Sequence, residues 1–231
     1  MTTAVPTARR LRRVTAGASL VLFAGLLVPQ ALIDPAEGGT GEVMFRAATE
    51  QSAALTTSAV LLIVSALLMA PAAAGVLHQA RDRGAGLANA GAVLAVLGGF
   101  GHFGIAVYYI VSLSLAGGDE AQMTAFIDRL NSSAVLGFVV FPLILSFALA
   151  VLVLPWAAWR AGAIGIWGPA VATAAVLVEE LLPFGSTAIT VVVLAAVTVV
   201  FGYLGVRVLR MTDSEWDGVR SISRTGAPVS A

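Results

Sequence analysis

GAGLANAGAVLAVLGGFGHFGIAVYYIVSLSLAGG, residues 84–118, is a run of 35 residues without a charged side chain. A helix needs about 20 apolar residues to cross the ~30 Å hydrocarbon core of a bilayer, so this run predicts a membrane-spanning helix. Five further charge-free runs of 18 to 30 residues occupy 14–33, 51–80, 130–159, 161–178 and 181–206. The sequence therefore predicts an all-α, polytopic membrane bundle of six transmembrane helices.

The composition agrees with a membrane protein. Hydrophobic residues make up 58% of the chain, charged residues 11%, and the mean hydropathy is +0.93. A soluble domain carries roughly 25% charged residues, so lipid must cover much of this surface. The absence of cysteine excludes disulfides, thiolate metal sites and cysteine nucleophiles.

The 13 arginines, which are the only cationic residues besides histidine, predict the orientation. With the N-terminus in the cytoplasm, eleven arginines fall on the cytoplasmic side and only Arg46 and Arg129 fall outside. Arginine-rich loops remain in the cytoplasm, so both termini are expected there, in a bacterial inner membrane. The expected parts are a basic N-terminus (1–13), a six-helix domain (14–208) and a flexible cytoplasmic tail (209–231).

An arginine-rich start followed by an apolar run is also typical of a cleaved signal peptide. However, the run of 20 residues in 14–33 exceeds the usual apolar region of such a peptide, and residues 30–34 contain no small-x-small cleavage site. A retained first helix is therefore favoured.

The expected helices span about 14–33, 52–79, 87–115, 133–158, 162–180 and 186–208. The fifth is the weakest, because Gly162, Gly165, Gly168 and Pro169 crowd its first half. A short surface helix is expected in each of the first two outer loops. In 119–131, an apolar stripe at helical spacing predicts a helix that lies on the membrane or packs on the bundle.

The helices could form three similar hairpins. The glycine pairs that open the first two outer loops are 79 residues apart, and Arg81 and Arg160 are separated by 79 residues as well. An internal repeat would explain this spacing, as would the biased composition of membrane sequences, and both interpretations stay open.

His102 is the leading candidate for a functional residue, because an ionisable side chain is costly in hydrocarbon unless it has a partner. Tyr109 follows seven residues later on the same helix face, and Ser112 lies in the same half. One interpretation is a polar pocket or proton-relay element. The other is a neutral histidine that is hydrogen-bonded across an interface of small residues.

Glu179 and Glu180 are the second candidate, at the outer end of the fifth helix. The 18 apolar residues before them span about 27 Å, which places both near the membrane surface and favours a solvated turn. In a helix that sits deeper, Glu180 would meet His102 and Tyr109 in a common pocket.

The sequence lacks the residues that other known activities of membrane proteins require, so no catalytic, cofactor-binding or metal-ligating residue is predicted. His78 and His102 lie at depths roughly 15–20 Å apart, which excludes paired axial ligation of one haem. Retinal attachment needs a lysine, and neither H-E-x-x-H nor G-x-S-x-G occurs. Phe184 stands where the E-E-x-x-x-R signature of membrane-embedded CAAX-type proteases has arginine. The basic N-terminus is explained by topology and anionic lipid, without nucleic acid.

Lysine-free spans rich in Ala, Val, Leu and Gly, short Arg-Gly inner loops and Gly-Gly acidic outer loops recur over most of 10–208. In these features the chain resembles small multi-pass actinobacterial membrane proteins that are grouped only as domains of unknown function. The resemblance includes no specific motif and assigns no site residue.

Two function classes remain. Helices interrupted by glycine and proline favour a protein that binds or transports a small molecule through a pocket lined by His102, Tyr109 and Glu180. The absence of a dense polar cluster favours a non-catalytic accessory or scaffold protein that binds another membrane protein or a second copy of itself. An enzyme is the third choice.

Overall fold

The computed structural model describes residues 5–36, 39–181 and 186–216, and it leaves the side chains of 5–7 and Glu180 undescribed. Within those ranges the chain is almost entirely helical. The elements are α1 (Val5–Ile33), α2 (Gly41–Glu50), α3 (Ser52–Ala80), α4 (Ala85–Leu115), α5 (Glu120–Asn131), the π-helical turn η1 (Leu136–Val140), α6 (Phe141–Arg160), α7 (Trp167–Leu181), α8 (Thr187–Arg210) and α9 (Asp213–Trp216).

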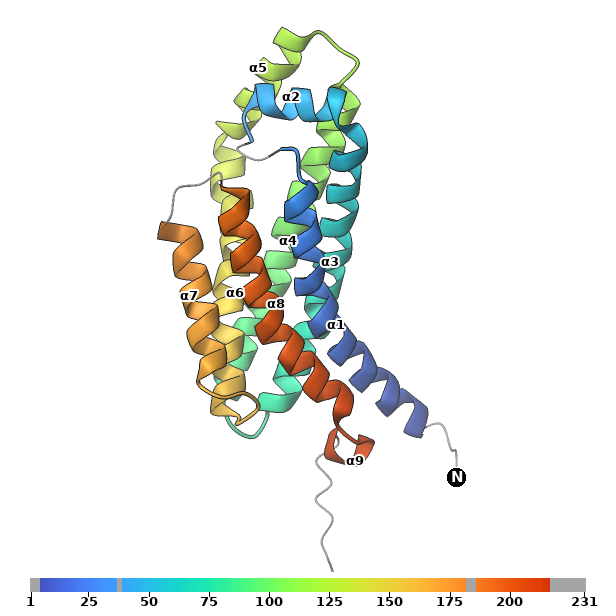
Figure 1. Cartoon of the computed structure of the whole chain (residues 1–231), viewed down its shortest axis with the longest axis vertical. Coiled ribbons are helices and arrows are strands. Elements are labelled where there is room, and N and C mark those ends of the chain that lie inside the picture. Colours follow the sequence, from blue (N-terminus) through green and yellow to red (C-terminus); the bar gives the residue numbers. More distant parts are fainter. Residues whose placement is uncertain (1–4, 37–38, 182–185, 217–231) are drawn as a thin grey trace, which may run out of the picture.

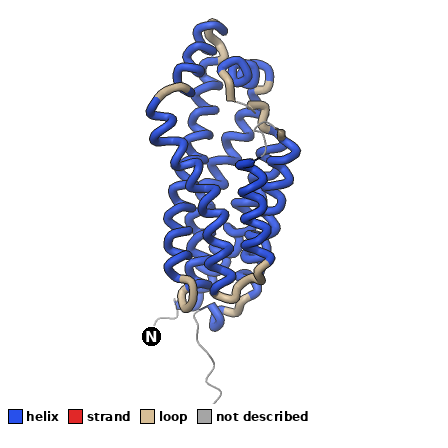
Figure 2. Tube along the Cα trace, turned by 90° about the vertical axis from the view of Figure 1, so that its left-hand side faces the viewer, coloured by secondary structure: helices blue, strands red, loops and turns tan. Residues whose placement is uncertain are grey.

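Six of these helices form a closed ring. Each packs against the next in the order α1, α3, α4, α6, α7, α8, and α8 returns to α1. Successive helices of the ring run in opposite directions; α3, α4, α6 and α7 follow the long axis, and α1 and α8 are inclined to it (Figures 1 and 2). Helix α7 packs less extensively on its two neighbours than the other members do.

In the described part of the chain, five helices are long and apolar enough to cross a membrane: Ala8–Ile33, Ser52–Ala80, Ala85–Leu115, Leu136–Arg160 and Thr187–Arg210. Their lengths of 24 to 31 residues suit a bilayer. Helix α7 has 15 residues, about 22 Å at 1.5 Å per residue, which is short for a span. The bundle is therefore that of a multi-pass membrane protein, while a sixth span stays a prediction.

The late start of α7 differs from the expected helix over 162–180. Gly162 has φ +73°, a left-handed conformation that interrupts a helix. The guanidinium of Arg207 on α8 donates hydrogen bonds to the carbonyl oxygens of Gly162 (3.2 Å) and Ala163 (2.5 Å). These carbonyls are thus satisfied by α8 rather than by a helix of their own, and α7 begins only at Trp167.

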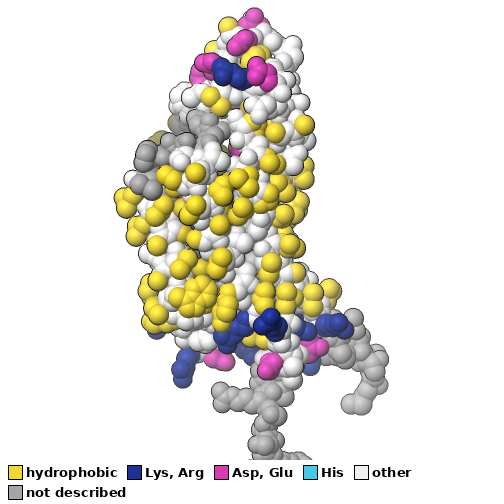
Figure 3. Space-filling view, viewed as in Figure 1, with side chains coloured by type: hydrophobic (Ala, Val, Ile, Leu, Met, Phe, Trp, Pro, Cys, Tyr) yellow, Lys and Arg dark blue, Asp and Glu magenta, His cyan; other side chains and the backbone are white. Residues whose placement is uncertain are grey.

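Charge divides the molecule along its long axis (Figure 3). One end carries most of the arginines and is called the arginine end; the opposite end, formed by α2 and α5, carries most of the acidic residues and is called the acidic end. Between them lies a broad apolar surface, on which Phe100 is 61% and Val192 68% exposed. Lipid chains solvate such a surface, whereas water would not.

Two surface helices cover the acidic end (Figure 1). The expected helix over 119–131 is present as α5, capped by Asp119, and Ile127 is the member of its apolar stripe that is buried. Asp128 of α5 accepts a hydrogen bond from the Gly41 amide at 2.8 Å, which fixes α5 to the start of α2. Helices α2 and α5 therefore form one cap, and each connects the two long helices of a hairpin, α1 with α3 and α4 with α6.

The first part of the expected flexible tail is folded. The Arg13 guanidinium on α1 pairs with Asp213 at 3.0 Å, and Trp216, 6% exposed, stacks on His78 of α3 with ring centroids 3.6 Å apart. Arg81 also donates to the Trp216 carbonyl at 3.1 Å. These contacts hold α9 against the arginine end, and residues 217–231 of the expected tail lie outside the described residues.

Candidate functional site

A cavity of about 400 Å³ lies inside the ring, in the half nearer the acidic end. All six helices of the ring contribute to its wall, which is mostly leucine, isoleucine, valine and phenylalanine. The polar side chains on it are Gln30, Asp34, His102, Tyr109, Glu179 and Thr190. A mainly apolar cavity of this size with a few polar groups is typical of small-molecule sites.

Two glycines place His102 on this wall. A Cβ atom on Gly98 would lie 2.7 Å from the Phe147 Cα, and one on Gly101 would lie 2.7 Å from the Ile144 nitrogen. Only glycine permits so close an approach of α4 to α6. The His102 ring therefore rests directly on Phe147, with centroids 4.4 Å apart.

His102 is 7% exposed, and its Nδ1 atom has no hydrogen-bond partner among the described residues. A structural histidine was expected to bond across the small-residue interface, and the described residues contain no such bond from Nδ1. A buried ring nitrogen without a partner leaves a polar group unsatisfied, which is costly in an apolar wall.

Asp34 is the centre of a hydrogen-bond network at the acidic end of the cavity. Its Oδ2 atom accepts from the Tyr109 hydroxyl at 2.6 Å and from the Gln30 amide at 2.7 Å. Its Oδ1 atom accepts from the Ala36 backbone amide at 3.0 Å. The network ties the end of α1 to α4 and fixes the carboxylate at the cavity wall.

Asp34 directly follows the first charge-free run, and no role was predicted for it from the sequence. Gln30 and Asp34 are four residues apart, so they share a helix face at the end of an apolar run. That pair is the signal that sequence reasoning could have used.

The predicted site residues are brought together only in part. His102 and Tyr109 line the same cavity, and Glu179 joins them from α7, where it accepts from Thr190 at 3.4 Å. Glu179 is half-buried at the cavity, although a solvated turn was favoured for it, and the Glu180 side chain lies outside the described residues. Ser112 is buried away from the cavity and donates to the Tyr108 carbonyl of its own helix at 2.9 Å.

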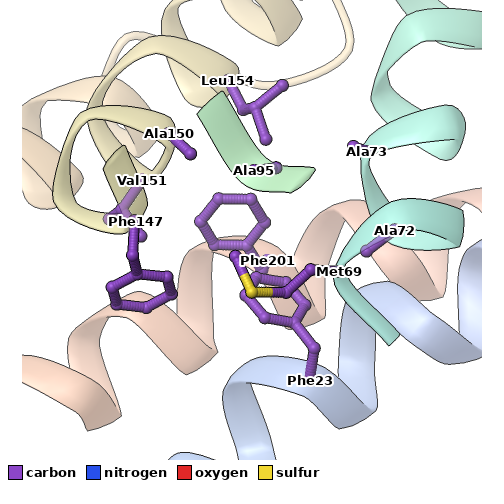
Figure 4. A pocket seen from close by; sticks show the side chains of 10 residues that line it. All are labelled: Phe23, Met69, Ala72, Ala73, Ala95, Phe147, Ala150, Val151, Leu154 and Phe201. Atoms are coloured by element: carbon purple, nitrogen blue, oxygen red, sulfur yellow. The ribbon is translucent and has the colours of Figure 1, made fainter. Parts of the chain in front are cut away.

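Three phenylalanines, Met69 and small aliphatic side chains surround a small space next to the cavity, on its arginine side (Figure 4). Phe23 and Phe201 meet edge to face at 5.0 Å and, with Met69 and Phe147, form what we call the hydrophobic plug. The space that the plug and its neighbours enclose is about 10 Å³, room for at most one water molecule. The site is thus blocked toward the arginine end.

At the opposite side, a second cavity of about 270 Å³ adjoins the first, under the cap and beside η1. The two share Ile105, Tyr109 and Ile144 in their walls. Figure 3 shows a hollow below the cap with an acidic side chain in it. The two cavities together thus extend from the middle of the ring to the cap.

The chemistry of the wall is that of hydrogen-bond acceptors in an apolar surround. No arginine is among the described residues that line the cavity. Among the described residues, no three histidine, aspartate or glutamate side chains are arranged to hold a metal ion. The site therefore suits an organic molecule that fills an apolar space and meets a carboxylate.

No family model, curated protein or solved structure matches this chain. The resemblance to small actinobacterial membrane proteins stays a prediction.

Proposed function

We propose that the protein binds a small, mainly apolar molecule in the cavity at the centre of its ring, and that the ligand arrives from the acidic end. The cavity of about 400 Å³, with His102, Tyr109 and Asp34 on one wall, is the observation that carries this proposal. The hydrophobic plug favours binding over transport, because transport would require the packed side chains of the plug to separate in each cycle.

We also propose that α7 is a sixth span and that the arginine end faces the cytoplasm of a bacterial inner membrane. The cluster of arginines at one end of the apolar surface supports this orientation. A bilayer can thin locally around a helix of about 22 Å, at a modest cost in free energy.

A scaffold role is the second candidate, and it rests on the apolar surface near η1, where Phe138 is 84% and Val135 67% exposed. Lipid chains can cover this surface as well as a protein partner can. A partner-binding protein would not need the cavity, so the experiment that follows separates the two.

Ligand binding should depend on His102. We would screen neutral and charged aromatic fragments against the protein in lipid nanodiscs and follow the thermal unfolding midpoint. A fragment present at a hundred times its Kd stabilises the folded state by about 2.7 kcal/mol. His102→Leu should abolish that stabilisation, because leucine removes the ring nitrogens from the wall.

Ser112→Ala is the matched control, since Ser112 is buried on the same helix but away from the cavity. It should keep the full response to each fragment. Equal stabilisation of wild type and a folded His102→Leu would contradict the proposal and favour the scaffold role.

A further inference from the structure

We propose that the ligand is a small organic cation, a protonated amine carried on an apolar body. The inference rests on the proposed function, and it concerns the charge of the molecule that the cavity takes.

The Asp34 carboxylate has no cationic partner. It accepts three hydrogen bonds from neutral donors, in the manner of an ionised carboxylate. Among the described residues, no arginine forms an ion pair with it. A half-buried negative charge next to an apolar cavity is poorly solvated, and a bound cation would compensate it.

The arginines at the acidic end cannot supply this compensation. Arg46 is exposed on α2 and already pairs with Glu42 at 2.6 Å. Arg129 is exposed on α5, and neither arginine lines the cavity. Within the described part of the chain, no arginine therefore compensates the charge of Asp34, and a bound cation would do so.

The rest of the wall fits the two parts of such a ligand. Each carboxylate oxygen has two acceptor sites, so Asp34 still has room for one donor beside Tyr109, Gln30 and Ala36. Tyr109, which donates to Asp34, also lines the cavity, and aromatic rings attract an ammonium group at their faces. The leucines and valines of α1, α3 and α8 would surround the apolar body.

An anionic ligand is disfavoured by the same features. A carboxylic acid in the cavity would meet Asp34 and Glu179 and would find no arginine on the wall. A neutral ligand would fill the cavity but would not compensate the negative charge of Asp34. The order of affinity should be amine, then alcohol, then acid.

Three fluorinated probes of nearly equal size test this order: 2-(4-fluorophenyl)ethylamine, 2-(4-fluorophenyl)ethanol and 3-(4-fluorophenyl)propanoate. Their binding to the protein in nanodiscs is followed by ¹⁹F NMR, and empty nanodiscs of the same lipid measure partition into the membrane. The ammonium brings a full positive charge to the Asp34 carboxylate, whereas the alcohol offers only a neutral hydroxyl donor, so the amine should bind at least about tenfold more tightly than the alcohol. The propanoate should show no saturable binding.

Asp34→Asn removes the charge and keeps the shape. It should lower the affinity for the amine to that for the alcohol and leave the affinity for the alcohol unchanged. Asp82→Asn, the same change at an exposed carboxylate of the arginine end, should have no effect. If Asp34→Asn does not fold, the comparison of the three probes on the wild type still tests whether the cavity prefers a cation.

Equal saturable binding of all three probes, lost in His102→Leu, would overturn the cation inference and leave the proposed function standing. Absence of saturable binding by the amine would also overturn it, and the fragment screen would then judge the proposed function independently.

Discussion

Gly98 and Gly101 determine what His102 contacts. With side chains at these positions, α4 could not approach α6, and the His102 ring would lose its place on Phe147. A glycine in a helix costs about 1 kcal/mol relative to alanine. Here that cost is offset by the close packing of the two helices that form one wall of the cavity.

Gly101→Ala should destabilise the protein by about 1–3 kcal/mol, because the new methyl group would overlap the backbone of Leu143 and Ile144. The measurement is the thermal unfolding midpoint in detergent. Gly202→Ala on α8 is the control, since nothing lies within 4 Å of its Cβ position. It should be neutral or stabilising, and an equal loss in both variants would show that helix packing is not the cause.

At this scale the sequence revealed His102 and Tyr109 but not Asp34. A lone histidine in a charge-free run is conspicuous, and a residue seven positions later shares its helix face. Asp34 lies one residue beyond the first run and resembled any acidic loop residue. Its role depends on a hydrogen bond to Tyr109, 75 positions away, which local patterns do not contain.

Among the elements, α1 begins earlier and α7 later than the sequence predicted, and α9 was not predicted. The long helices were predictable because charge-free runs of helix-forming residues have few alternatives in lipid. The start of α7 could not be predicted in this way, because it depends on Arg207 of the next helix. The residues of α9 were expected to belong to a flexible tail. Their attachment depends on a contact between Trp216 and His78, which are 138 positions apart, and local sequence patterns do not reveal such a contact.

Trp216→Ala should release α9 from the arginine end. The loss of the buried indole and its stacking on His78 should weaken docking by about 1–2 kcal/mol, which raises the undocked fraction roughly 5- to 30-fold. Trypsin should then cleave after Arg210 faster by a similar factor, as measured by mass spectrometry. Trp216→Phe, which keeps an aromatic ring, should be cleaved more slowly than Trp216→Ala; equal rates would contradict docking by stacking.

On the scale of the whole molecule, charge and apolar surface are arranged along one axis, and this much follows from the order of charged and apolar runs in the sequence. The order of the helices around the ring does not follow from the sequence in this way. It depends on which small-residue faces meet, such as Gly205 of α8, where a Cβ would lie 2.6 Å from the Gly17 carbonyl of α1. The cavity is a product of that order, so its volume could not be predicted.

The absence of cysteine allows a direct test of orientation. Ser132→Cys, Ser186→Cys and Ser214→Cys each introduce one thiol, the first two near the acidic end and the third in α9. A membrane-impermeant maleimide should label the first two in intact cells and the third only after permeabilisation. If Ser132→Cys is labelled in intact cells but Ser186→Cys is protected, α7 does not span the membrane. If Ser214→Cys is labelled in intact cells and the other two are protected, the proposed orientation is wrong.

The hydrophobic plug has a consequence for the cell as well as for the site. Phe23, Met69, Phe147 and Phe201 leave space for no more than one water molecule, so an ion on this route would have to shed its hydration shell. The plug therefore leaves no water-filled path for an ion through this part of the ring. Many copies can therefore lie in a membrane without ion gradients decaying through the plug.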